Sequence, residues 1–294
     1  MDDPVALIET LRQTWRGVFP GGFERGLANT VVFGAFYFLL VLAIERACRT
    51  RTGNYRTRGF AHDLVYFVYF KSGLQKWVIP AALFSAASSP LSVLELNLLK
   101  DMPFAVQLVG WLLIGDFIGY WIHRAKHYFR FLWAFHTTHH SQEFITFATN
   151  SRIHPVEDLI GIAAHVVLLR LLGADPISSF LVYFVLAVMS EIQHTQIPWR
   201  LGPFYWIVVT PPFHLYHHST DPAHHDRNFG MVFSFWDYLF GTAVPRNTPA
   251  PTQFGLADVR PTSFWGTLVD PFRLLFKFYA PSRVGRGSAA DERT

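Results

Sequence analysis

An apolar run in the middle of the chain constrains its fold most. Residues 104–122, FAVQLVGWLLIGDFIGYWI, contain one acidic side chain, Asp116, and no basic one, and as a helix they are long enough to cross a lipid bilayer. Residues 27–44, LANTVVFGAFYFLLVLAI, approach the same length. The Arg-rich sequence that follows them, ERACRTRTGNYRTR, is expected on the cytoplasmic side of the membrane. The two runs predict a helical membrane protein.

The composition agrees with this class of protein. Of the 294 residues, 51% are hydrophobic, 17% aromatic and 16% charged, which is too apolar for a soluble domain of this length. The net charge of +4 is small, and the basic residues are mixed with aromatic ones, so a nucleic-acid partner is excluded. Cys48 is the only cysteine, which excludes a disulfide framework, a thiolate zinc module and an iron–sulfur cluster built within the chain. A metal would need nitrogen or oxygen ligands.

Two further apolar segments have less regular patterns. Residues 64–87 are broken by Lys71, Lys76 and Pro80, which leaves open a kinked span, a hairpin or an interfacial helix. Residues 159–190 contain two short apolar stretches separated by GADP, and we expect a hairpin that crosses and returns, or a re-entrant pair.

No linker or repeat divides the chain, so residues 1–280 are predicted to form a single domain. Its part from residue 191 onward has no uninterrupted apolar run and is expected at the cytoplasmic surface. The N-terminal sequence MDDPVALIET lacks the pattern of a cleaved signal peptide. The tail 281–294, PSRVGRGSAADERT, is predicted to be disordered.

Three histidine clusters have helical spacing. HRAKH, HTTHH and HLYHH repeat histidine at i, i+3 or i+4, so the imidazoles of each cluster are expected on one helix face. Eight imidazoles could supply two metal centres with about four nitrogen ligands each, and imidazole suits iron, zinc, copper and nickel. The eight are His123 and His127, then His136, His139 and His140, and finally His214, His217 and His218.

Other histidines have weaker signals. His194 follows an apolar helix and is expected to point into the same chamber as the clusters. His154 precedes a proline, which is also typical of a helix start, so both roles stay open. The remaining four are not predicted as ligands, and the adjacent pair 224–225 is expected to be exposed; they are His62, His165, His224 and His225.

Together these motifs resemble a known family. HRAKH, HTTHH, RIHPVE, HLYHH and NFGMVFSFWDYLFGT, in this order over residues 105–245, look like the fatty acid hydroxylase / sterol desaturase superfamily of membrane di-iron oxygenases. The resemblance implies an all-α polytopic bundle of about four transmembrane helices with a cytoplasmic helical cap that carries the metals. Ser190 stands where some hydroxylases have a second histidine, so the chain looks more like the sterol-desaturase-like and alkylglycerol-monooxygenase-like members.

The resemblance also implies roles for individual residues. His154 would be a further ligand or a group that positions one, and Asp116 would orient a ligand imidazole through its other ring nitrogen. The alternative for Asp116 is an ion pair with Arg124 or Lys126. Asp237 and Asn228 are expected to brace the cap. The implied ligands are His123, His127, His136, His139, His140, His194, His214, His217 and His218.

The implied activity is oxidation of a membrane lipid by O2 at two iron ions per chain, with zinc as an alternative metal in the purified protein. The substrate would be a sterol, a fatty acyl chain or an ether lipid, and both hydroxylation and desaturation stay open. The sequence contains no haem-, flavin- or cluster-binding segment, so a separate ferredoxin, cytochrome or reductase is expected to supply electrons. The Arg- and Ala-rich composition favours a bacterial inner membrane, with the endoplasmic reticulum as the eukaryotic equivalent.

Two other classes of protein compete with this interpretation. A histidine-rich metal transporter would place polar residues across the membrane, whereas the clusters here lie at or beyond the ends of apolar runs. A zinc-dependent membrane hydrolase would need a glutamate base near three ligands, and HExxH does not occur in the sequence.

Overall fold

The computed structural model describes residues 22–50, 52–71, 96–174, 176–199, 201–256 and 263–279. Regular structure in these ranges is helical, and β pairing there is limited to two isolated bridges. The prediction of an all-α fold is therefore confirmed for the described residues. The longer helices are α2 (Gly22–Ala47), α3 (Arg58–Lys71), α6 (Phe104–Tyr128), α7 (Arg130–His140), α8 (Pro155–Leu171), α9 (Pro176–Gln193) and α12 (Phe264–Tyr279). The short ones are η1 (Thr52–Arg56), η3 (Phe147–Ser151), η4 (Gly202–Trp206), α10 (Pro211–Leu215), η5 (Pro222–His224) and α11 (Phe235–Leu239).

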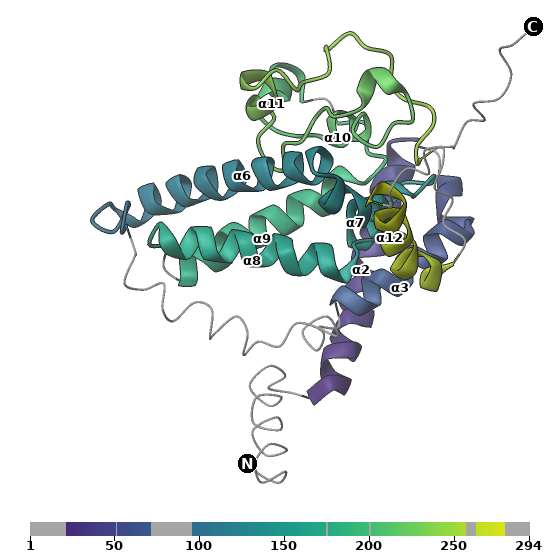
Figure 1. The fold of residues 1–294 in the computed structure, drawn as a ribbon, viewed down its shortest axis with the longest axis horizontal. Helices are drawn as coiled ribbons and strands as arrows, with labels where there is room; N and C mark the ends of the chain where they lie inside the picture. Colours follow the sequence, from purple (N-terminus) through teal and green to yellow (C-terminus); the bar gives the residue numbers. More distant parts are fainter. Residues whose placement is uncertain are drawn as a thin grey trace, which may run out of the picture.

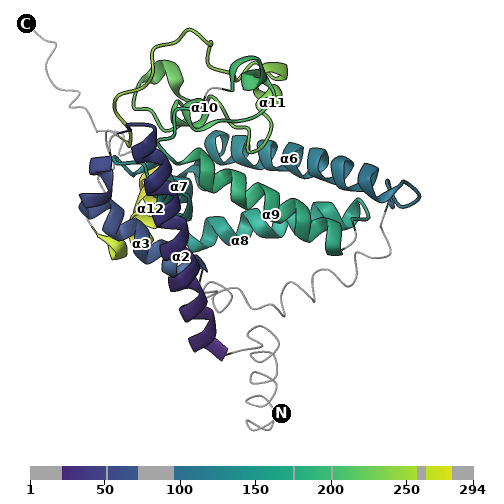
Figure 2. The ribbon, with the colours of Figure 1, turned by 180° about the vertical axis from the view of Figure 1, so that it is seen from behind.

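Helices α6, α8 and α9 lie side by side in one elongated layer (Figures 1 and 2). Their contact surface is apolar, with Trp111 and Ile118 of α6 packed against Val182 and Leu186 of α9. The helices approach closely at Gly115, where a Cβ atom would lie 2.5 Å from Cγ1 of Val182. Glycine is therefore required at this crossing, because a side chain would push α6 away from α9.

In the part of the chain that the structure describes, α6 is the one helix long and apolar enough to cross a membrane. Phe104 and Val109 near its start are 61% and 59% exposed, as expected for side chains that face lipid. The other predicted span, residues 27–44, lies within α2, where Val32 and Phe36 are 65% and 66% exposed.

The predicted hairpin over residues 159–190 is present as α8 and α9. Gly173 in the turn between them has a φ of 89°, which L-residues with a Cβ rarely adopt, and a Cβ there would lie 2.6 Å from Cα of Asn97. The segment 64–87 begins in α3, and its part from residue 72 lies outside the described residues, as does the predicted tail 281–294.

Residues 194–256 form a cap over one end of the layer, built from loops and the short helices α10 and α11 (Figure 1). Asp116 of α6 attaches the cap to the layer. Its buried carboxylate accepts hydrogen bonds from the backbone N–H groups of Val232 (2.7 Å) and Phe233 (3.0 Å) and from Nε1 of Trp236 (3.0 Å). A loop buried without a sheet needs such acceptors for its N–H groups.

Two buried polar residues brace the cap internally, as the sequence indicated. Asp237 accepts bonds from the backbone N–H groups of Phe229 and Gly230, each at 2.8 Å. Asn228 donates to the carbonyl of Phe213 (2.7 Å) and accepts from the backbone of Val244 (2.8 Å). The loop after α10 is thereby held against α10 itself.

A buried ion pair attaches the other side of the molecule to the end of α7. Nη1 of Arg152 lies 2.7 Å from Oδ1 of Asp63 on α3, and neither side chain has any exposed surface. The Asp63 carboxylate also accepts bonds from Gln142 (2.6 Å) and Thr149 (2.8 Å), while Nε of Arg152 donates to the carbonyl of Thr138 (3.2 Å). The segment that carries HTTHH is therefore fixed on both sides.

Candidate metal centre

The first two histidine clusters meet at a break between α6 and α7. Phe129 has an extended backbone (φ −90°, ψ 117°), and its N–H bonds to the carbonyl of Ala125, so α6 ends and α7 begins at once in a new direction. The break brings the ring of His127 to within 5.0 Å of His136 and 4.8 Å of His140, measured between centroids.

The third cluster is presented by α10. Thr210 caps this helix by accepting a hydrogen bond from the backbone of Phe213 (3.4 Å). Pro211 and Pro212 occupy the first turn, where a missing N–H costs nothing. The cap and the two prolines fix where this short helix begins. They therefore also fix the direction of the histidines that it carries.

The imidazoles of the described residues form two groups, and within each group the candidate ligand nitrogens lie within 4.8 Å of one another. The groups adjoin, because the rings of His140 and His218 are stacked with their centroids 4.6 Å apart. The structure thus brings all nine sequence-predicted ligands to two neighbouring points. Group A contains His123, His127, His136, His140 and His217, and group B contains His139, His194, His214 and His218.

The HTTHH cluster divides between the two groups, although one shared face was expected. His136 and His140 belong to group A, and His139 belongs to group B. Adjacent helical residues differ by about 100° around the axis, so His139 and His140 point to different neighbours. HLYHH divides in the same way, with His217 in group A and His214 and His218 in group B.

Group B has the chemistry of a cation site. Nε2 of His194 lies 3.2 Å from Nε2 of His139, 3.2 Å from that of His218 and 3.1 Å from that of His214. Nδ1 of His194 lies 2.6 Å from the carbonyl of Ser190, which can only accept, so Nδ1 carries the proton and Nε2 presents a lone pair.

The protonation states support the same conclusion. Burial lowers the pKa of His194 to about 4 and the pKa values of His214 and His218 well below the usual range, so these rings are neutral near neutral pH. Neutral rings at such distances direct the lone pairs of their Nε2 atoms toward one another. A metal ion between the rings would accept these lone pairs.

In group A, the outer ring nitrogens of four of the five histidines point to backbone carbonyls or carboxylates. Nδ1 of His123 lies 3.0 Å from the carbonyl of Phe229, and Nδ1 of His217 lies 2.7 Å from that of Arg227. The Nε2 atoms of His127 and His217 are buried and have no hydrogen-bond partner among the described residues. This pattern fixes the tautomer in which Nε2 is the free ligand atom.

Two carboxylates contact group A that the sequence did not single out. Oε1 of Glu157 lies 2.8 Å from Nδ1 of His136, and Oδ1 of Asp226 lies 3.2 Å from Nδ1 of His127. Glu157 lies in the RIHPVE motif, so the motif itself was the available signal. Asp226, with a φ of 55°, lies in a loop without any such signal.

The structure overturns the role implied for Asp116 and decides between the two roles left open for His154. The described hydrogen bonds of Asp116 go to the cap segment. Asp116 therefore holds the cap in place. It was expected to orient an imidazole or to pair with Arg124 or Lys126. His154 is outside both groups. Its Nε2 lies 3.1 Å from the carbonyl of Leu268, and its Nδ1 accepts from the backbone of Val156 (3.1 Å), as in a residue that starts a helix.

The four histidines that were not predicted as ligands are also outside groups A and B. The expectation of exposure was right for His225 and wrong for His224. His224 is 4% exposed, and its Nδ1 lies 2.9 Å from Oγ of Ser219. His165 is on α8 and faces α6. Its Nε2 would lie 3.5 Å from a Cβ atom built on Gly115.

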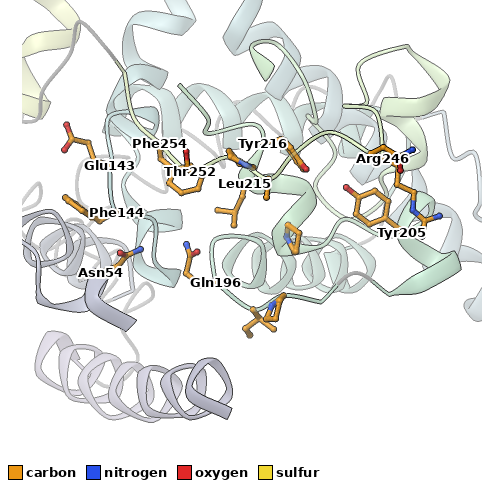
Figure 3. A pocket seen from close by; sticks show the side chains of 16 residues that line it. Asn54, Glu143, Phe144, Gln196, Tyr205, Leu215, Tyr216, Arg246, Thr252 and Phe254 are labelled. Carbon is orange, nitrogen blue, oxygen red and sulfur yellow. The ribbon is translucent and has the colours of Figure 1, made fainter. Parts of the chain in front are cut away.

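A cavity of about 720 Å³ lies beside α10, with Pro212 and Leu215 of that helix in its wall (Figure 3). Its wall includes Ile197, three residues after His194, and Leu215 and Tyr216, which lie between His214 and His217 in the sequence. The wall is partly polar, and Glu143 and Arg246 lie at its opposite ends in Figure 3. The wall contains none of the nine imidazoles.

Residues 108–242 match the family model "Fatty acid hydroxylase", and this region includes every histidine of groups A and B. This part of the chain is therefore similar to the fatty acid hydroxylase family, in line with the resemblance that the motifs indicated.

Three known proteins are similar to parts of this chain. The ornithine lipid hydroxylase OlsE of Rhizobium tropici is 31% identical over 217 residues, which cover 72% of this chain and 65% of the relative. An alkylglycerol monooxygenase of Caenorhabditis elegans is 34% identical over 146 residues, which cover 49% of this chain and 28% of the relative. The very-long-chain aldehyde decarbonylase GL1-5 of Oryza sativa subsp. indica is 27% identical over 139 residues, 43% of this chain and 22% of the relative. The matched regions thus span less than two thirds of each relative, and no solved structure matches the chain.

Proposed function

We propose that the chain is an oxidoreductase that uses O2 and two iron ions to hydroxylate or desaturate a C–H bond of a membrane lipid. The observation that carries this proposal is the convergence of nine imidazoles into two adjoining groups. The names of two relatives, an ornithine lipid hydroxylase and an alkylglycerol monooxygenase, support a lipid as the substrate class.

The chain's own residues hold and shield the reactive centre. When bound, the iron pair supplies, with O2 and electrons, the oxidising power to break an unactivated C–H bond. The nine histidines would hold the metals. The carbonyls of Ser190, Arg227 and Phe229 fix the ring orientations of His194, His217 and His123, respectively. Burial of the imidazoles excludes water. A separate ferredoxin, cytochrome or reductase would deliver the electrons.

The proposed location is a membrane, with a bacterial inner membrane as the most suitable one. In this arrangement α6 crosses the bilayer with the α8–α9 hairpin beside it, within a bundle of about four spans. The cap and both histidine groups lie at the cytoplasmic end of α6. A lipid chain could then reach the centre laterally while electrons arrive from the aqueous side.

The contacts of Glu157 make the rival zinc hydrolase less suitable. A hydrolase needs a carboxylate base beside an open ligand position. Glu157 is the carboxylate next to His136, and it binds the outer nitrogen of that ring and Nζ of Lys126, each at 2.8 Å. It therefore supports a ligand from behind and does not face the metal position.

The proposal is tested by metal analysis combined with isotope labelling. The full chain, expressed in iron-supplemented medium and purified in detergent, is expected to contain about two iron ions per chain. With an electron donor and extracted lipids it should consume O2, and a hydroxylated product should carry ¹⁸O from labelled O2, whereas desaturation would remove two hydrogens. Retention of zinc alone under iron-rich, reducing conditions, without O2 consumption, would favour the transporter or the hydrolase instead.

We further propose that the cavity beside α10 receives the polar end of the lipid. Its mixed lining and its charged ends suit a head group, and its wall is built from the segments that carry group B. A head group bound there would fix the distance from the membrane surface to the reacting carbon.

Filling this cavity should impair turnover without removing metal. Thr252→Trp is expected to lower kcat/KM by about tenfold or more, because a displaced head group misplaces the reacting carbon. Kinetics with a fixed lipid and metal analysis of the same sample check this result. Ala223→Trp, an exposed change that lies outside the cavity wall, is the matched control. Unchanged kinetics in Thr252→Trp would place the head group elsewhere.

A further inference from the structure

We infer that groups A and B are unequal metal sites, and that group A binds its ion first and more tightly because Glu157 and Asp226 support its ligands. This inference rests on the proposed function in one respect, since it requires that both groups bind metal. It assigns Glu157 as a positioning residue that acts on the metal through His136.

Glu157 is placed to act on a single ligand. Its side chain is 3% exposed, and Oε1 lies 2.8 Å from Nδ1 of His136. A carboxylate that accepts the outer N–H of an imidazole fixes the ring and makes its other nitrogen a stronger donor to a metal. Nε2 of the same ring lies 3.2 Å from Nε2 of His140, so the effect reaches the centre of group A.

Lys126 forms an ion pair with this buried carboxylate. Nζ of Lys126 lies 2.8 Å from the same Oε1 atom, and the lysine side chain is 20% exposed. The cation offsets the cost of burying the carboxylate beside the imidazole of His136. The three side chains form a chain of contacts from the surface to the metal position: Lys126, Glu157 and His136.

Asp226 gives group A a second carboxylate. It lies 3.2 Å from Nδ1 of His127, and its side chain is 73% exposed. Water screens an exposed carboxylate, so its effect on the imidazole is smaller than that of Glu157.

Group B lacks this support in the part of the chain that the structure describes. The outer nitrogen of His194 bonds to a neutral carbonyl, and the Nδ1 atoms of His214 and His218 are buried without a hydrogen-bond partner. Group B also has four imidazoles where group A has five. Both differences favour tighter binding of a divalent cation in group A.

The inference is tested by titrating the metal-free full chain, in detergent, with Co²⁺ under anaerobic conditions. Calorimetry gives the affinity of each step, and visible absorption distinguishes a four-coordinate from a five-coordinate Co²⁺ site. Wild type is expected to bind two ions in two resolved steps. His214→Ala, which removes a group B ligand, should abolish the second step and leave the first.

Glu157→Gln is the decisive variant. It should weaken the first step by about 10- to 100-fold and leave the second unchanged. Asp101→Asn removes a carboxylate charge at an exposed site outside both groups and outside the cavity wall, and it should alter neither step. Asp226→Asn should weaken the first step by a smaller factor. If Glu157→Gln does not fold, Asp226→Asn tests whether a carboxylate strengthens metal binding in group A.

Each contrary result has a distinct meaning. If wild type binds no Co²⁺, the proposed metal function itself fails. If wild type binds two ions with equal affinity, the sites are equivalent and the inference is overturned. The same holds if Glu157→Gln weakens the step that His214→Ala removes, or if both carboxylate variants leave the first step unchanged.

Discussion

Replacing His139 with alanine should abolish lipid oxidation and reduce the metal content from about two ions per chain to about one. His139 lies in group B, with its Nε2 3.2 Å from Nε2 of His194, and its removal leaves three imidazoles there. Group A keeps all five of its ligands. Elemental analysis and turnover of one purified sample give both quantities.

His225→Ala is the matched control, because His225 is an exposed imidazole outside both groups. It should keep both metal ions and wild-type turnover. Full activity in His139→Ala, or equal metal loss in the two variants, would contradict the assignment of group B.

The second large effect concerns stability. Arg152→Leu should lower the free energy of unfolding by about 3–5 kcal/mol, because it leaves the fully buried carboxylate of Asp63 without its cation. Since this pair fixes the segment that follows HTTHH, a loss of metal is expected together with the loss of stability. The thermal midpoint in detergent, measured on the metal-free protein, isolates the effect on the fold.

Arg273→Leu is the matched control for Arg152→Leu. It breaks the pair between Arg273 and Asp270, whose side chains are 74% and 33% exposed, and such pairs contribute about 0–1 kcal/mol. Equal thermal midpoints for the two variants would show that the Arg152–Asp63 pair does not hold the fold together.

Much of this site could be predicted because its ligands follow local periodicity. His123 and His127 are one helical turn apart on α6, and both reach group A. The division of HTTHH could not be predicted, because it depends on what lies on each side of α7. His139 meets His194 and His214 of the cap, and this contact exists only after the cap has folded. His140 instead meets His127 across the break between α6 and α7.

The expectation for Asp116 failed for a related reason, and the choice between the two roles left open for His154 depended on the same kind of contact. Both residues have sequence positions that suit a metal site, but a carboxylate or an imidazole binds whatever donor or acceptor the folded chain brings to it. The cap brings N–H groups to Asp116, and α12 brings the carbonyl of Leu268 to His154. Glu157, by contrast, could have been recognised from the same motif as His154.

The cap contacts of the outer ring nitrogens have a consequence for the life of the protein in a cell. The carbonyls of Arg227 and Phe229 orient His217 and His123, and these carbonyls are placed by a loop that has almost no regular structure of its own. Under the proposed function, closing of the loop and capture of the metal would be coupled steps, since each would stabilise the other. A chain made without its metal would then keep its cap open to proteases for longer, so metal supply would set how much of the protein accumulates.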